Sequence, residues 1–102
     1  MTALRIADFK VAEGRHDEAI QAINGFLIPR MESAAGFISG YWVLDEASGE
    51  GTAVTLWASE EARATFGTAS REAMMAGGAL SSTTIRDLPL VAMSSGAAAT
   101  RS

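Results

Sequence analysis

Residues 36–66 constrain the fold more than any other segment, because they read as two apolar strands, a Gly-rich turn and a capped helix. In the strand Phe37–Leu44, large apolar side chains occupy both phases of the two-residue alternation. The alternation predicts two sets, one on each face: Ile38, Trp42 and Leu44, and Phe37, Tyr41 and Val43. A sheet that is apolar on both faces must be covered on both faces. One chain of 102 residues cannot easily supply both covers, so the pattern favours a dimer.

Composition indicates one ordered domain. Apolar residues make up 48% of the chain and charged residues 20%, which is typical of a globular protein. The length is close to the commonest domain size. We expect a single domain over residues 1–93. Residues 94–102 (SSGAAATRS) are small and polar, and we expect them to form a disordered tail.

Several classes of partner and site are disfavoured. The net charge is −4 and the basic residues are scattered, which argues against nucleic-acid binding. The chain has no cysteine, so disulfides and thiolate metal sites are excluded. No apolar run approaches the roughly 20 residues of a membrane span. Arg5, Asp8 and Lys10 interrupt the start, where a signal peptide needs an apolar stretch. A cytoplasmic location without a membrane partner is therefore expected.

The order of predicted elements is βαββαβ. Apolar residues at helical spacing, from Ile20 to Met31, mark the first helix. Ser59 is a good N-cap for the second. The predicted elements are a strand Leu4–Val11, a helix Arg15–Ser33, strands Phe37–Leu44 and Thr52–Ala58 around the turn Asp45–Gly51, a helix from Ser59 to Gly77-Gly78, and a strand Ser82–Met93. This order predicts an α+β, ferredoxin-like sandwich, a four-stranded antiparallel sheet with both helices on one face.

Two prolines predict irregularities. Pro29 lacks an amide hydrogen, and its ring clashes with the carbonyl four residues back, which belongs to Gly25. We therefore expect a kink or break between Gly25 and Pro29, of a kind that opens space beside a sheet. Pro89 interrupts the last strand and is expected at a sheet edge or a bulge.

The segments GFISGYWVL and GTAVTLWASEEARATF resemble the dimeric α/β barrel superfamily, in particular the antibiotic biosynthesis monooxygenase-like proteins. The resemblance spans residues 4–91. It rests on a Gly near position 14, a helix ending in Pro-Arg, the pair Gly36-Phe37, and a tryptophan on the third strand before a Ser-Glu-Glu cap. It implies a homodimer and a monooxygenase that needs no cofactor and no metal. The substrate would be a small planar aromatic or polyketide-type molecule.

The resemblance places Trp57 in a pocket between sheet and helices, where an indole offers a flat apolar wall and one donor. Tyr41, Phe66, Leu27 and Met74 are the substrate-binding candidates that accompany it. The alternative for all of them is simple core or interface packing. For Trp57, the two interpretations are compatible.

Asp8 and Arg86 complete the catalytic candidates. A carboxylate under an apolar helix layer can accept a proton near neutrality, which would make Asp8 a base. Arg86 could neutralise a phenolate or enolate. Structural ion pairs are the alternative for both. The one histidine, His16, lies at the start of the first helix, away from where heme-degrading relatives have theirs, so heme degradation is not expected.

Two other functions remain open. The first is a non-catalytic dimeric module that binds a small apolar ligand in the same pocket. The second is an isomerase or cyclase of the same fold, in which Asp8 would shuttle a proton without oxygen. Fold alone does not separate them.

Overall fold

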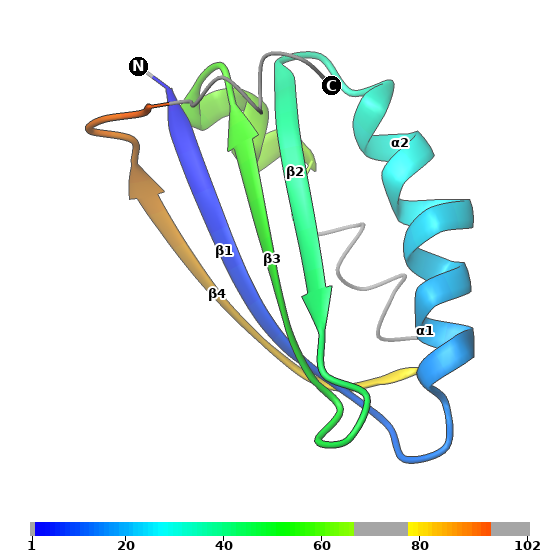
Figure 1. The fold of residues 1–102 in the computed structure, drawn as a ribbon. Helices are drawn as coiled ribbons and strands as arrows, with labels where there is room; N and C mark the ends of the chain where they lie inside the picture. Colours follow the sequence, from blue (N-terminus) through cyan, green and yellow to red (C-terminus); the bar gives the residue numbers. More distant parts are fainter. Residues whose placement is uncertain (1, 67–77, 95–102) are drawn as a thin grey trace.

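One antiparallel sheet organises the computed structural model, which describes residues 2–66 and 78–94. Its strand order is β2-β3-β1-β4. Along the chain the elements are β1 (Ala3–Val11), α1 (His16–Ala22), the π-helix η1 (Ile23–Leu27), α2 (Ile28–Glu32), β2 (Phe37–Leu44), β3 (Glu50–Trp57) and β4 (Leu80–Pro89). Residues 60–66 are also helical. Both helical segments lie on one side of the sheet (Figure 1), which confirms the ferredoxin-like α+β architecture.

The strand bounds differ slightly from those expected. Strand β3 begins at Glu50 rather than Thr52, because the turn before it is shorter than predicted. Strand β4 begins at Leu80 and ends at Pro89, whereas the apolar pattern extended it to Met93. Pro89 has no amide hydrogen to donate, and it closes a strand at the edge of the sheet, as predicted.

The first helix contains the predicted irregularity, but as a wider helical turn and not as a break. The amide of Ile28 donates to the carbonyl of Ile23, five residues back, and this defines the π-helix η1. Pro29 then stands in the first turn of α2. A π-turn shifts the hydrogen-bond register just where Pro29 cannot donate to Gly25, so the helix continues past the proline.

The two sheet faces carry side chains of different size. On the helix-covered face, Ala7 and Ala53 pair directly across β1 and β3, and both are small. On the open face the same two strands carry larger apolar residues: Leu4, Ile6, Val54 and Leu56. Small residues under the helices leave space between the two layers.

A bulge corrects the expected orientation of Phe37. The β2–β3 register shifts between Phe37 and Ser39, so Phe37 pairs with Trp57 and its ring lies 5.2 Å from the indole, under the helices. The extra residue, Ile38, is 51% exposed. One inserted residue reverses the alternation on its N-terminal side. Beyond the bulge Trp42 packs under the helices and Tyr41 lies on the open face, so the prediction that these two residues point to opposite faces is confirmed.

The second helix begins as predicted. The Ser59 hydroxyl accepts a hydrogen bond from the amide of Ala62 at 3.1 Å, which is the N-cap arrangement. Gly36 has a φ of +86°, and a Cβ there would lie 2.5 Å from Cβ of Ala62, so only glycine allows this close approach. The predicted end of the helix at Gly77 lies outside the described residues.

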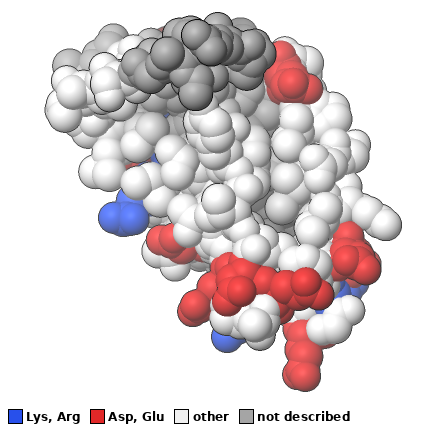
Figure 2. Space-filling model, in the orientation of Figure 1, with Lys and Arg blue, Asp and Glu red and all other residues white. Residues whose placement is uncertain are grey.

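Charge is unevenly distributed over the surface. Figure 2 shows acidic side chains gathered at the lower end of the view, where Figure 1 places the β2–β3 turn and the loop before α1. Within the described residues, this face carries no broad basic area. Across the same part of the chain, no helix has both the length and the apolar character needed to cross a membrane.

Candidate functional site

A cavity of about 100 Å³ lies between the sheet and the helices. For comparison, an engineered apolar cavity of about 150 Å³ binds benzene in another protein. All four strands, η1, α2 and the helical residues 60–66 contribute to its lining. The lining residues are Arg5, Ala7, Phe9, Ile23, Leu27, Met31, Trp42, Ala53, Thr55, Trp57, Phe66, Leu80, Thr83 and Ile85. The cavity is therefore about the size of one aromatic ring, so it can hold a single-ring ligand or one ring of a larger ligand among mainly apolar side chains.

Trp57 forms a wall of this cavity and is fully buried. Its indole lies 5.3 Å from the ring of Phe66, and Leu27 packs against the same cluster. The indole Nε1–H donates to the hydroxyl of Thr55 at 3.0 Å. The single donor of Trp57 is therefore occupied within the protein, and its contribution to the cavity is an apolar surface.

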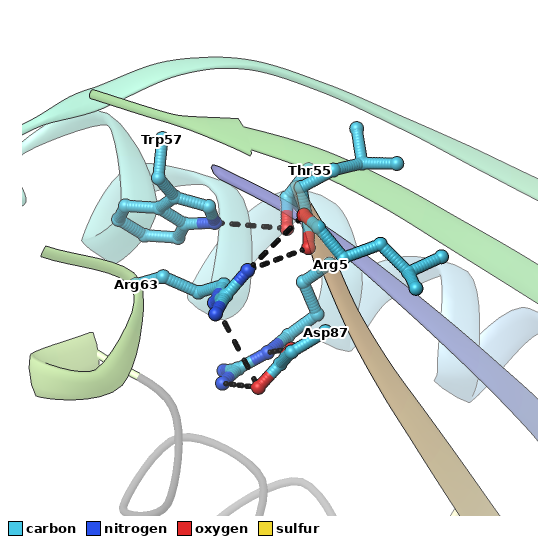
Figure 3. Close-up of polar contacts among 7 residues, drawn as sticks. Arg5, Thr55, Trp57, Arg63 and Asp87 are labelled. Carbon is cyan, nitrogen blue, oxygen red and sulfur yellow. Dashed lines mark hydrogen bonds and ion pairs between the residues drawn. The ribbon is translucent and has the colours of Figure 1, made fainter. Parts of the chain in front are cut away.

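A row of four residues crosses the helix-covered face beside Trp57. Gly40, Thr55, Arg5 and Asp87 are successive partners across β2, β3, β1 and β4. Directly opposed residues of an antiparallel pair have their Cβ atoms about 5 Å apart. The register therefore brings one hydroxyl, one guanidinium and one carboxylate together (Figure 3).

Gly40 makes room at one end of that row. A Cβ there would lie 2.7 Å from Cη2 of Trp42 and 3.3 Å from Cγ2 of Thr55. Because Gly40 has no side chain, the ring of Trp42 can lie over it and complete the cavity wall.

The guanidinium of Arg5 is held by Asp87. Nε and Nη2 of Arg5 donate to the two carboxylate oxygens at 2.7 and 3.1 Å. Arg63 lies on the other side of that carboxylate, with its Nε 3.7 Å from Oδ2, and its Nη1 donates to the carbonyl oxygens of Leu4 and Leu88 (Figure 3). The hydrogen bonds from Arg5 lower the pKa of Asp87, and the charge of Arg63 adds to the effect.

Three of the predicted site residues lie outside the cavity, on the open face. Asp8 accepts a hydrogen bond from the Thr52 hydroxyl at 2.8 Å and is 3.9 Å from Arg86. Tyr41 is 69% exposed. In β1 the side chain of Asp8 points away from the helices. Asp8 therefore does not lie beneath an apolar helix layer, where a catalytic base was expected.

The structure brings together Trp57, Phe66 and Leu27 of the predicted set, and adds Arg5 and Thr55. Met74 lies outside the described residues. Side-chain alternation could have found Arg5 and Thr55. Arg5 lies on the same face of its strand as the buried Phe9, and Thr55 lies on the same face as Trp57. The bulky open-face residues of β1 hid this signal.

Comparison with solved structures gives close matches of fold at low identity. No family model and no curated protein matches the sequence. Rv0793 from Mycobacterium tuberculosis superposes with a TM-score of 0.72 at 18% identity, covering 93% of this chain and 100% of that one. A point mutant of SnoaB, a cofactor-independent oxygenase from Streptomyces nogalater, gives 0.70 at 15% identity, with 90% and 95% covered.

A third match was solved with a ligand. The monooxygenase from the gene ActVA-Orf6 of Streptomyces coelicolor, in complex with nanaomycin D, gives a TM-score of 0.68 at 18% identity, with 92% of each chain covered. Identities this low establish fold and not activity. The chain therefore shares its fold with Rv0793, SnoaB and the ActVA-Orf6 monooxygenase, in agreement with the architecture that its sequence pattern indicated.

Proposed function

We propose that this protein is a cofactor-independent monooxygenase-like enzyme that acts on a small planar aromatic or polyketide-type molecule. One observation carries the proposal: an apolar cavity walled by Trp57 and Phe66 lies beside a single polar row. Aromatic walls favour a flat ligand, and the described lining is otherwise nearly all apolar. The oxygenases among the matched structures support the same class of reaction.

The proposed reaction begins when an activated CH₂ group of the substrate loses a proton. The electron pair left on carbon reduces dioxygen to a carbon-bound peroxide anion, which takes up a proton and becomes a hydroperoxide. Loss of water then leaves a carbonyl group, so one oxygen atom enters the product and the other leaves as water. The protein has to exclude solvent and stabilise the negative charge that develops on the substrate.

Oxygen uptake by purified, metal-free protein with an anthrone-type substrate tests this proposal. We expect consumption above the rate without protein. The variant Ala7→Leu should abolish it, because the larger side chain fills the cavity. Gln21→Leu, at an exposed position of α1, is the matched control and should retain the rate. Consumption no greater than background would refute the proposal.

A non-catalytic ligand-binding module is the second candidate. The observation that favours it is that Arg5 is the only ionisable residue in the described lining, so no carboxylate or imidazole is found there to act as a base. Ligand binding without turnover, in air and under anaerobic conditions, would select this candidate. Anaerobic turnover would instead select an isomerase or cyclase.

We also propose that the active form is a homodimer joined through the open face of the sheet. Tyr41, Val43 and Leu88 are exposed on that face, next to the half-buried Ile6 and Val54. Large exposed apolar surfaces mark interaction sites, and two-fold dimers are the commonest oligomers. A second copy would cover an apolar surface that this chain leaves open.

A further inference from the structure

We propose that Arg5 and Thr55 together bind an ionised oxygen of the ligand, a carboxylate, phenolate or enolate attached to an aromatic ring. The proposal deepens the proposed function and rests on it in one respect, that the ligand occupies the cavity beside Trp57. It assigns a specific ligand chemistry to two residues that lie directly opposite each other on β1 and β3.

Arg5 supplies the charge. Its side chain is 16% exposed and lines the cavity. Two of its nitrogens, Nε and Nη2, are used on Asp87. Within residues 2–66 and 78–94, Nη1 makes no hydrogen bond, so its two donors remain for a ligand. Asp87 holds the guanidinium in a fixed orientation, which lowers the entropy cost of binding.

The charge of Arg5 is not fully cancelled. Asp87 is shared between Arg5 and Arg63, and this group of three carries a net charge of +1. Arg63 is itself largely buried and directs Nη1 to two backbone carbonyls. An anion in the cavity would therefore meet an incompletely neutralised cation in surroundings of low polarity, where charge interactions are stronger than in water.

Thr55 supplies an oriented hydroxyl. It is 3% exposed and accepts the indole N–H of Trp57. A hydroxyl also carries one donor, and no acceptor for it occurs among the described residues. The bond from Trp57 occupies one lone pair of the oxygen, which restricts the directions in which the hydroxyl can donate. The cavity, which Thr55 lines, is where that proton can find an acceptor.

Such a site would also help ionisation. By binding the anion more tightly than the neutral form, Arg5 lowers the pKa of the bound ligand. The proton can then pass to solvent water as the ligand enters, without a carboxylate base in the cavity. This accounts for a lining in which Arg5 is the one ionisable group among the described residues.

Two matched probes test the inference without any turnover. Benzoate and benzamide have nearly the same shape and differ in charge, and one ring suits the cavity volume. NMR titration of the ¹⁵N-labelled protein gives both dissociation constants, with the Trp57 indole N–H as the reporter of the site. We expect benzoate to bind roughly tenfold more tightly than benzamide. This difference corresponds to about 1.4 kcal/mol, close to the contribution of one hydrogen bond to a charged group.

Variants then assign the effect to the two residues. Arg5→Met keeps the length of the side chain and should remove the preference for benzoate, whereas Arg5→Lys should keep part of it. Thr55→Val should weaken benzoate binding several-fold, and Thr55→Ser should restore it. If Arg5→Met does not fold, the probe pair on the unmodified protein still decides the question.

The outcomes separate this inference from the proposed function. Equal affinity for the two probes would overturn the anion site and leave the cavity as a place for a neutral ligand. Failure of both probes to bind would overturn both proposals. If the protein prefers benzoate but shows no oxygen uptake, the anion site is supported and the proposed oxygenase function is contradicted.

Discussion

Arg5 shows how one residue can change the chemistry of a cavity. Its neighbours across the sheet are Thr55 on one side and Asp87 on the other, and the three lie in a single row on the helix-covered face. A buried cation normally needs a partner, and Asp87 provides it through two hydrogen bonds. The pairing fixes the guanidinium beside Trp57 without using all of its donors.

The first prediction concerns Asp87→Asn. Because hydrogen bonds from Arg5 lower the pKa of Asp87, this carboxylate stabilises the fold above its unfolded pKa of about 3.9, and the contribution is lost as the pH falls through the lower folded value. Asp87 is 36% exposed, so solvent screening keeps the expected loss at pH 7 to about 1 kcal/mol.

Urea unfolding at pH 7 and at pH 3 measures this effect. The difference between the unmodified protein and Asp87→Asn should shrink at the lower pH. Asp8→Asn is the matched control, since its ion pair with Arg86 spans 3.9 Å on an exposed surface, and it should cost less at pH 7. If the difference in the free energy of unfolding between the unmodified protein and Asp87→Asn is the same at both pH values, the stabilising role of the ionised Asp87 carboxylate is contradicted.

At the level of elements, two irregular features build the cavity. The π-helix η1 carries Ile23 and Leu27 into the lining without ending the helix. The bulge in β2 places Phe37 against Trp57, under the helices. Each feature changes the number of residues per repeat at one point, and each alters which side chains face the core.

The second prediction concerns the cap of the helical residues 60–66, which carry Arg63 and Phe66 to the site. Ser59→Ala removes the acceptor of the Ala62 amide and should lower the free energy of unfolding by about 1 kcal/mol. Ser59→Asp keeps an acceptor at the N-cap and should stay close to the unmodified protein. Thermal unfolding followed by circular dichroism compares the two variants. Equal midpoints for Ser59→Ala and Ser59→Asp would contradict a stabilising N-cap at this position.

Across the molecule as a whole, the two faces of the sheet have opposite roles. The helices cover one face, and the cavity lies between them and the sheet. The other face carries apolar residues from β1, β2, β3 and β4, together with the pair Asp8 and Arg86. If two copies meet there, as proposed, the cavities lie on the outer sides of the paired sheets and each protomer has its own site.

The third prediction tests that pairing. Val43 is 62% exposed on the open face, and Val43→Lys would bring two added charges into a two-fold interface. We expect the unmodified protein to sediment as a dimer at micromolar concentration and Val43→Lys to sediment as a monomer. Gln21→Lys adds the same charge on the exposed side of α1 and should remain a dimer. A monomeric unmodified protein would contradict the homodimer.

Local patterns in the sequence were enough to predict the order of elements, the cap at Ser59 and the edge position of Pro89, whereas the burial of Trp57 was an implication of the family resemblance. The first three depend on short-range signals, namely the alternation of apolar residues, a hydroxyl before a helix, and a residue without an amide hydrogen. The irregularity near Pro29 was also predictable, although its π-helical form was not.

Which face of the sheet the helices cover could be learned from the folded chain alone. Both phases of β1 contain apolar residues, and the hypothesis that Asp8 acts as a base required its phase, with Leu4 and Ile6, to lie under the helices. The helices instead cover the phase of Ala7 and Phe9, where small residues leave a cavity and where Arg5 meets Thr55. Side-chain alternation gives two sets of residues but does not say which set is inside, because that depends on how distant segments pack.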